Sequence, residues 1–445
     1  MSGGYRAYEE YKESGVEWLG MVPDHWSLKK AKYLFQKAQR NINSLDGIIT
    51  AFRDGQVTLR SNRRTDGFTN ALKEIGYQGV KKGDLLIHAM DGFAGAIGVS
   101  DSDGKCSPVC SVCVPFNNKY VYVKFYGYLI RQLAVTDYIS SLAKGIRERS
   151  TEFRFVEFSA LHMPIPTFNE QVQIFDFLDH ETAKIDTLIE KQNQLIELLK
   201  EKRQAVISHA VTKGLDPDAP MKDSGIEWID TIPSHWRIKP TFASCTATTS
   251  KNASGMKNNV LSLSFGNIIQ RDVDTNFGLL PESFNTYQIV DEGDVILRLT
   301  DLQNDKNSLR VGLVKQKGII TSAYLKLKSK RELHSQFLYQ LLHSYDTTKV
   351  FYGMGGGLRQ SMKFEDFRRL PLLVPPHLEQ IQIAAFLAHE TAKIDTLIEL
   401  QQQQINLLKE RRTALISAAV TGKIDVRNWC APQVVSESKI PEATA

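Results

Sequence analysis

The clearest pattern of hydrophobic and polar positions lies in residues 177–216, where apolar side chains recur every three or four residues. This spacing places the apolar side chains along one side of a helix. Forty residues in a helix span about 60 Å. The stretch returns as residues 386–425, identical at 28 of 40 positions. We therefore predict two long helices of nearly the same sequence and an internal repeat.

Along each predicted helix, apolar positions follow alternating steps of four and three residues, as in a coiled-coil seam with polar interruptions. Further apolar residues flank this seam, so each helix has more apolar surface than one narrow contact covers. In the plain interpretation the two helices pack on each other as a spacer. In the functional interpretation they also present an apolar stripe to a partner, and we favour both together. The seam and partner-binding residues are Ile174, Leu178, Ile185, Leu188, Leu195, Leu199, Ile383, Leu387, Ile394, Leu397, Leu408 and Leu415.

The ends of the predicted helices carry their own signals. Thr167 and Glu170 have the spacing of a capping box, in which each side chain bonds a free amide of the first turn. Gly214 and Gly422 stand where a left-handed residue would end each helix.

The repeat extends beyond the helices. Residues 14–18 (SGVEW) return as 224–228 (SGIEW), and residues 23–26 (PDHW) return as 233–236 (PSHW). Residues 77–86 (YQGVKKGDLL) correspond to residues 287–296 (YQIVDEGDVI). Between these landmarks the two copies differ almost completely. The pattern indicates tandem duplication of a whole domain with its helix, rather than an array of short units.

Within each copy, short β-branched and aromatic runs are bounded by Gly, Asp and Pro, which is typical of strands. One further helix is expected in each copy, at residues 124–143 and 335–343. The predicted fold class is α+β, a duplicated mixed α/β domain followed each time by a long helix. The predicted divisions are 1–166, 167–216, 217–375, 376–425 and a flexible tail at 426–445.

Composition narrows the class of protein. With 42% hydrophobic and 24% charged residues, the chain is typical of soluble globular proteins. It has no apolar run of membrane-spanning length and no apolar leader segment, so we expect it in the cytoplasm. The net charge of +5 permits a polyanionic partner without requiring one. The five cysteines are interpreted as buried small hydrophobic residues in a reducing compartment, because a metal site would need four paired ligands.

Recognisable catalytic motifs are missing from the sequence. It has no phosphate-binding G-x-x-x-x-G-K-[ST] loop, no H-E-x-x-H and no G-x-S-x-G. The glycine-rich residues 353–357 do not follow a strand in a βαβ unit, so they do not indicate a dinucleotide site. His25 and His235 recur beside a Trp and are interpreted as packing or turn residues. We therefore predict no catalytic residue and no metal site.

Basic residues cluster with amide and aromatic neighbours in the divergent parts of both copies. Arg and Lys hold phosphates, and Arg also pairs with guanine edges, so these clusters are candidate DNA contacts. A charge cluster is more often a solvated face, but Gly-apolar-Arg recurs at residues 145–147 and 357–359 in both copies. The candidate DNA-binding residues are Arg53, Arg60, Arg63, Arg64, Lys144, Arg147, Arg149, Arg298, Arg310, Arg359 and Lys363.

The repeated motifs support a family resemblance. The most specific are HETAKID at residues 180–186 and 389–395, and Q-x-Q-I at 171–174 and 380–383. With the duplicated G-[VI]-E-W and P-x-H-W segments, the chain resembles the specificity (S) subunit of a type I restriction-modification system over essentially its whole length.

The resemblance implies that each variable domain is a target recognition domain reading one half of a bipartite, asymmetric site in double-stranded DNA. It implies that the long helices pack as an antiparallel coiled coil, set the spacer and dock two methyltransferase (M) subunits. Restriction/translocase (R) subunits would join that complex. No cofactor is expected in this chain, because S-adenosylmethionine, ATP and magnesium would belong to the partner subunits. The chain would then be a non-catalytic DNA-binding subunit.

Two other functions remain open from the residues. One is a stand-alone DNA-cleaving enzyme with an unrecognised site, which would cut DNA with magnesium alone. The other is a coiled-coil scaffold carrying two ligand-binding domains, which would show no salt-dependent binding to one bipartite site.

Overall fold

The computed structural model describes residues 5–63, 67, 74–141, 152–271, 283–300, 302, 308–353 and 362–431. The chain forms two compact units. Unit 1 comprises Met1–Lys191 and Gln403–Ala445, and unit 2 comprises Gln192–Gln402. The long helices α4 (Phe168–Lys213) and α8 (His377–Val420) each contribute one part to unit 1 and the other to unit 2.

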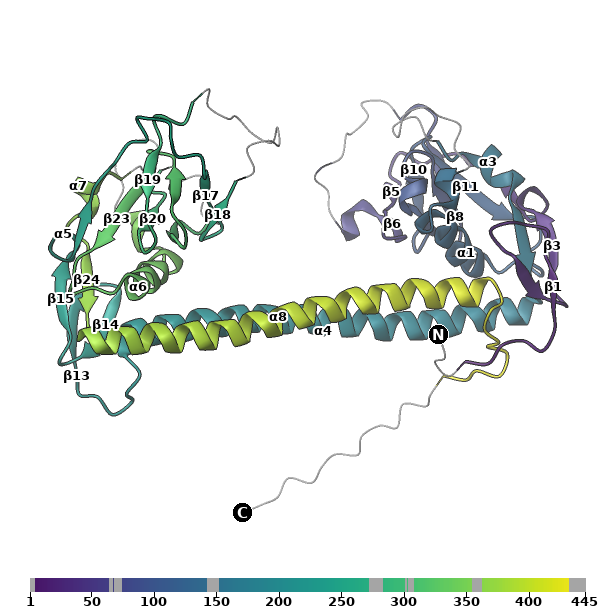
Figure 1. Ribbon diagram of the computed structural model, residues 1–445. Helices are drawn as coiled ribbons and strands as arrows, with labels where there is room; N and C mark the ends of the chain where they lie inside the picture. Colours follow the sequence, from purple (N-terminus) through teal and green to yellow (C-terminus); the bar gives the residue numbers. More distant parts are fainter. Residues whose placement is uncertain are drawn as a thin grey trace, which may run out of the picture. The chain divides into compact units, whose positions relative to one another are not determined.

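Unit 1 is built on a four-stranded antiparallel sheet in the order β4-β11-β8-β9. Alternate side chains of its strands point to opposite faces, so the run Leu85–His88 of β8 supplies two cores. Leu85 and Ile87 pack with helix α1, whereas Leu86 packs with a second, smaller cluster under the hairpin β5–β6. Both faces of the sheet are therefore covered (Figure 1). The strands are β4 (Phe35–Lys37), β11 (Cys110–Pro115), β8 (Leu85–His88) and β9 (Ile97–Val99), and α1 is Val123–Val135.

Shorter strand pairs complete unit 1, and all are antiparallel. They are β1 (Tyr11–Glu13) with β2 (Met21–Pro23), β3 (Ser27–Lys30) with β12 (His162–Ile165), β5 (Ile49–Ala51) with β6 (Val57–Leu59), and β7 (Gln78–Val80) with β10 (Gly104–Cys106). The short helices are η1 (Ala31–Tyr33), η2 (Arg60–Asn62), η3 (Gly92–Ala94), α2 (Tyr138–Ser141) and α3 (Phe155–Ala160).

Unit 2 repeats this plan strand by strand, which confirms the predicted duplication and the α+β class. Its sheet runs β16-β23-β20-β21, again antiparallel. The strands are β16 (Cys245–Ala247), β23 (Leu325–Ser329), β20 (Val295–Leu297) and β21 (Val311–Leu313), and the covering helix is α6 (Ser335–Thr347). The further pairs are β13 (Met221–Ile226) with β14 (Ile229–Pro233), β15 (Arg237–Pro240) with β24 (Pro371–Val374), β17 (Leu261–Ser264) with β18 (Asn267–Gln270), and β19 (Gln288–Val290) with β22 (Gly318–Ile320). The short helices are α5 (Thr241–Ser244), η5 (Val350–Gly353) and α7 (Phe364–Phe367).

The repeated Gly-Asp of the landmark near residues 83 and 293 forms the same turn in each unit. Gly83 and Gly293 have φ of 92° and 88°, a conformation that glycine adopts without steric cost. The carboxylate of Asp84 then accepts a hydrogen bond from the Lys81 amide at 2.7 Å, and Asp294 does the same from Asp291 at 2.9 Å. The motif recurs because this turn leads directly into the central strands β8 and β20.

The repeated His-Trp pair attaches each domain to the first turn of its long helix. In unit 1, Trp26 Nε1 donates to Glu170 Oε1 at 3.0 Å, and His25 Nε2 lies 3.0 Å from Glu170 Oε2. In unit 2, Trp236 and His235 contact Glu379 in the same way, at 3.0 and 2.8 Å. The histidines were expected as packing or turn residues, but both are exposed and contact the helix glutamate, so they serve domain attachment instead.

The glutamine that opens each Q-x-Q-I motif ties the long helix to α1 or α6. Gln171 Oε1 accepts from the Tyr122 amide at 2.8 Å, and its Nε2 donates to Tyr120 and Pro166 carbonyls. Gln380 accepts from the His334 amide at 2.7 Å in unit 2. Tyr122 and His334 are therefore equivalent positions, and this equivalence aligns the sequence of α1 with that of α6.

The predicted helix ends hold with one correction. Gly214 directly follows α4 with a φ of 80°, and Gly422 lies two residues after the end of α8 with a φ of 73°. The Thr167 hydroxyl accepts from the Glu170 amide at 3.3 Å. The Glu170 carboxylate, however, is engaged by Tyr8, His25 and Trp26, so Glu170 serves domain attachment and not the return bond of a capping box.

In each unit α4 and α8 pack antiparallel. In unit 1, Arg412 Nε donates to Asp186 Oδ1 at 2.9 Å, and in unit 2, Arg203 Nε donates to Asp395 Oδ1 at 2.9 Å. Within unit 1 an early part of α4 therefore lies beside a late part of α8 (Figure 1). The predicted antiparallel coiled coil is confirmed in both units.

The predicted seam and partner-binding residues differ in burial along the helices. Ile174, Leu178, Ile185, Ile383, Leu387, Ile394 and Leu415 are buried, and Leu199 and Leu408 are half-buried. Leu188, Leu195 and Leu397 instead face outward, with 46%, 40% and 44% exposure. Their neighbours take the inner positions: Ile196 and Ile405 are buried, and Ile189 and Ile398 half-buried. Because both sets have a seven-residue spacing, only packing against the second helix selects between them.

The helix predicted at residues 124–143 is interrupted. Helix α1 ends at Val135, and Asp137 adopts a positive φ of 60° before α2 begins. Lys349 follows α6 in unit 2 with a φ of 64°. A residue with positive φ therefore follows the corresponding helix at the equivalent position of both units. Helix α6 runs four residues further than predicted, to Thr347.

Four cysteines are buried as expected, but Cys430 is exposed. Burial raises the pKa of the Cys245 thiol to about 12. Nowhere in the described part of the chain do three or more His, Cys, Asp or Glu side chains gather as metal ligands would. Among the described helices, none combines the length and apolar character of a membrane span.

The packed chain continues past the end of α8 into the segment predicted as a tail. Val426 is buried, and the Trp429 ring lies edge-on to Phe177 at 5.5 Å. Residues 432–445 lie outside the described residues.

Candidate nucleic-acid interface

In unit 1, three of the candidate arginines lie on one hairpin. The β5–β6 register pairs Ala51 with Val57 and leaves a five-residue turn, on which Arg53 is exposed. Arg60 and Arg63 follow β6, in and directly after the turn of 3-10 helix η2. The hairpin is fixed by its buried residues Ile49, Ala51 and Val57, which pack under the sheet. The sequence cluster is therefore also a cluster in space.

Each of these arginines has a polar or aromatic neighbour. Arg53 pairs with Asp91 at 2.7 Å and Arg63 with Asp54 at 2.7 Å. The Arg63 guanidinium also lies 4.2 Å from the centre of the Phe52 ring. Exposed ion pairs of this kind are worth only about 0–1 kcal/mol, so a phosphate could displace the carboxylates at little cost.

Unit 2 has the equivalent hairpin, β17–β18, with a different tip. Its register pairs Ser264 with Asn267, so the turn consists of Phe265 and Gly266 alone. Both have positive φ, 45° and 78°, as in a type I′ turn. A positive φ is rare for a bulky residue, and the Phe265 side chain is 78% exposed. The turn thus projects an aromatic ring into solvent.

The repeat also reveals a candidate that the sequence reasoning missed. The Arg60 amide bonds the Ile48 carbonyl at 2.9 Å, and the Arg271 amide bonds the Val260 carbonyl at 2.8 Å. Arg271 therefore occupies in unit 2 the place of Arg60 in unit 1. The spacing of the arginine from its hairpin could have identified it, but too few identical residues surround it to align the copies.

Burial argues against one predicted DNA contact. Arg310 is fully buried, and its Nη1 donates to the carbonyls of Thr300 at 2.8 Å and Arg298 at 3.2 Å. Its backbone amide donates to Asp346 Oδ2 at 2.5 Å. Burial raises the pKa of Asp346 to about 6, and the hydrogen bond from Arg310 opposes that rise. Arg310 is a core residue in this structure, because its guanidinium bonds interior carbonyls and, through Nε, the Tyr352 hydroxyl at 3.2 Å.

The remaining candidates fall in several places. Arg298 is half-buried beside Arg310, and Lys363 is exposed directly before α7. Arg64, Lys144, Arg147, Arg149 and Arg359 lie outside the described residues.

The outward-facing leucines of the long helices are further candidate contacts in each unit, and are here called together the leucine stripe. It comprises Leu188, Leu195, Leu198, Leu397, Leu400 and Leu407, all between 40% and 61% exposed. Isolated exposed leucines are ordinary, but several on the long-helix segments of one unit suit a protein partner.

Comparison with known proteins connects this architecture to one family. No family model matches the chain. The chain is 25% identical over 312 residues to a Methanocaldococcus jannaschii protein named as the MjaX specificity subunit of a type I restriction enzyme. The matched region covers 67% of this chain and 68% of that protein.

Solved structures share the fold. A chain from a study of complex assembly and conformational transition of the type I R-M system has a TM-score of 0.61 at 16% identity, covering 91% of this chain and 99% of that one. The HsdS subunit from Thermoanaerobacter tengcongensis has a TM-score of 0.53 at 15% identity, with 91% and 98% covered. The chain is thus similar in sequence, over two thirds of its length, to the specificity subunit of a type I restriction enzyme. It is similar in fold, over nine tenths of its length, to chains from type I restriction-modification systems.

Proposed function

We propose that this chain is the sequence-specific DNA-recognition subunit of a type I restriction-modification complex, with each unit reading one half of a bipartite site. The observation that carries the proposal is that one frame is built twice with different hairpin tips. The tip between β5 and β6 carries Arg53, whereas the tip between β17 and β18 is Phe265–Gly266. Different readers on the same frame suit a site whose two halves differ.

The chemistry of the tips fits DNA. Arginine side chains bind phosphates and guanine edges, and an exposed aromatic ring can stack on or wedge between bases. Arg271 places a cation at the foot of the second hairpin, as Arg60 does in the first. Loss of one phosphate contact lowers the salt dependence of log K by about 0.9.

The leucine stripe suits the docking of methyltransferase subunits. It lies on both long helices, outside their mutual contact, and each Leu side chain that becomes buried contributes about 1.5–3 kcal/mol. In this assignment the chain is non-catalytic, and the methyltransferase and translocase partners bind S-adenosylmethionine, ATP and magnesium.

The decisive experiment selects duplexes from a random library with the purified chain, alone and with its methyltransferase. We expect two unlike blocks of bases separated by a fixed spacer. Exchange of residues 27–160 for those of another specificity subunit should change one block and leave the other intact. A palindromic site, or a change in both blocks, would contradict the proposal.

The same preparations test the competing functions. Cleavage of DNA by the chain with magnesium alone would favour a stand-alone nuclease. Binding without salt dependence or sequence preference would favour a scaffold. For docking, Leu198→Glu should weaken methyltransferase binding at least tenfold without loss of helix content. Glu201→Gln, at an exposed polar position on the same helix, is the matched control.

A further inference from the structure

A cavity of about 610 Å³ lies in unit 1 between the domain and its long helices. All residues that line it belong to unit 1. They come from the β5–β6 turn, the turn before β8, β9 and the residues after it, α1, α4 and α8. Its volume is in the range of about 300–1,000 Å³ that is typical of small-molecule sites. Neither the hairpin arginines nor the leucine stripe accounts for it.

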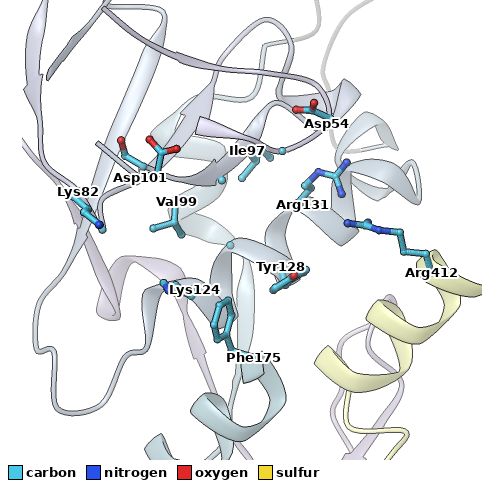
Figure 2. A pocket seen from close by; sticks show the side chains of 15 residues that line it. Asp54, Lys82, Ile97, Val99, Asp101, Lys124, Tyr128, Arg131, Phe175 and Arg412 are labelled. Atoms are coloured by element: carbon cyan, nitrogen blue, oxygen red, sulfur yellow. The ribbon is translucent and has the colours of Figure 1, made fainter. Parts of the chain in front are cut away.

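The lining is cationic and partly aromatic. Lys82, Lys124, Arg131 and Arg412 contribute four cations, against the carboxylates of Asp54 and Asp101. Asp54 is paired with Arg63 at 2.7 Å and Arg412 with Asp186 at 2.9 Å. This leaves Lys82, Lys124 and Arg131 against Asp101, so the cavity retains positive charge. Figure 2 shows Arg131 on α1 and Arg412 on α8 pointing toward one another, with the rings of Tyr128 and Phe175 nearby.

Arg131 is held in this place without a full set of partners. Its Nε is buried and has no hydrogen-bond partner among the described residues. Burial lowers the pKa of Arg131, and the neighbouring charge of Arg412 lowers it further. A buried N–H without an acceptor costs about 1–3 kcal/mol. An anion between the two guanidinium groups would supply that acceptor and relieve their repulsion.

Unit 2 carries different side chains at the equivalent positions. When α1 is aligned with α6, His343 occupies the position equivalent to Arg131, and Tyr339 the position equivalent to Gly127. Arg203, the counterpart of Arg412, lies close enough to lower the pKa of His343. The Tyr339 ring stacks on His343 with centroids 5.8 Å apart. Unit 2 therefore supplies its own ring, and has a neutral imidazole instead of a guanidinium.

We propose that the unit 1 cavity binds a small anion that carries a planar ring, of the chemical class of a nucleoside monophosphate. The phosphate would lie between Arg131 and Arg412. The ring would lie against Tyr128 and Phe175, where Gly127 leaves no side chain of its own. The Lys124 ammonium, 4.7 Å from the Phe175 ring centre, borders the same space. This site does not depend on DNA recognition by the hairpins.

The test is calorimetric titration of the full-length chain, without DNA, using adenosine monophosphate, adenosine and inorganic phosphate as probes. The monophosphate should bind at least tenfold more tightly than either fragment. Equal binding of phosphate would overturn the role of the ring, and equal binding of adenosine would overturn the role of the anion. Absence of binding by all three at millimolar concentration would overturn the site.

Two variants locate the site. Arg412→Gln should weaken monophosphate binding roughly tenfold or more, because it removes a charge-assisted hydrogen bond. It also breaks the ion pair with Asp186, so the control is Arg203→Gln, which breaks the corresponding pair with Asp395 in unit 2. The control should bind like the unaltered chain. Equal losses in both variants would show that the effect comes from the helix pair, which would overturn the proposal.

Lys124→Gln provides a second variant at an exposed position. It should lower the affinity for the monophosphate about two- to tenfold and change no other property of the chain. An unchanged affinity for this variant together with an unchanged affinity for Arg412→Gln would place any binding elsewhere.

Discussion

The tip of the β17–β18 hairpin offers a direct test of whether structural strain serves recognition. Phe265 has a φ of 45° and yet is 78% exposed, so its conformation is imposed by the turn and not by burial of its ring. The hairpin itself is anchored, because Leu263 and Ile268 lie against the position of Gly312. A bulky residue in this region of φ costs of order 1–3 kcal/mol. We predict that Phe265→Asn stabilises the hairpin, since Asn adopts positive φ more readily.

The magnitude follows from two terms. Relief of strain should recover about 1 kcal/mol. Loss of the ring should cost little, because the Phe265 ring buries about the same share of its surface in both states. That share is small in the folded protein, and the unfolded chain itself buries about 10–40% of the surface counted as exposed in an extended chain. A gain of 1 kcal/mol corresponds to about a fivefold change in the opening equilibrium. Amide hydrogen exchange of a peptide covering residues 259–271 should therefore slow about fivefold.

The same variant should bind target DNA less well. Stacking of a base on an aromatic ring is worth about 1–3 kcal/mol, so the affinity should fall at least fivefold. Phe265→Leu is the matched control, because it removes the ring but keeps a side chain that disfavours positive φ. It should lose affinity without slowing exchange. Unchanged or faster exchange in Phe265→Asn would refute the strain argument, and unchanged affinity would refute the contact.

Three further predictions concern the cores. Ile196→Ala should lower the free energy of unfolding by about 2–5 kcal/mol, whereas Leu195→Ala, at an exposed position, should lower it by less than about 1 kcal/mol. Urea denaturation followed by circular dichroism compares the two variants. Equal losses of stability would favour the seam predicted from the sequence. Arg310→Met should destabilise unit 2 by about 3 kcal/mol, because it leaves buried carbonyls without a donor, while the salt dependence of DNA binding stays unchanged; a shallower slope would instead indicate a phosphate contact. Burial lowers the pKa of His343 to about 4, below its unfolded value of about 6.5, so protonation favours the unfolded state and stability is lost as the pH falls from about 6.5 to 4, by up to about 3 kcal/mol. Asp346, with a pKa raised to about 6, acts in the opposite direction in both proteins, so the difference between the unaltered chain and His343→Gln isolates the histidine; parallel pH profiles would contradict the assignment.

Much of the architecture could be predicted from the sequence because repetition makes it visible. Residues 180–186 and 389–395 are identical, and the P-x-H-W and Gly-Asp landmarks mark the start of each domain and its central strand. These are local requirements: a turn needs a glycine with positive φ, and a helix start needs a glutamate for the indole of Trp26 or Trp236. Periodicity likewise predicted two long helices with their glycine ends.

The tertiary structure alone decided which face of each helix is buried. Leu188 and Ile189 both belong to a seven-residue series, so no count along one helix can rank them. The choice depends on what the second helix presents at that level, and Ile189, Ile196 and Ile405 pack inward while leucines remain outside.

The fate of single charges was also decided in three dimensions. Arg310 and Arg53 look alike in sequence, but one lies among interior carbonyls and the other on a hairpin turn. Arg131 and Arg412, 281 positions apart in the chain, meet at one cavity only because antiparallel packing brings the end of α8 beside α1. Local chemistry thus determined the frame and its repeats, whereas long-range packing determined which side chains remain free to act.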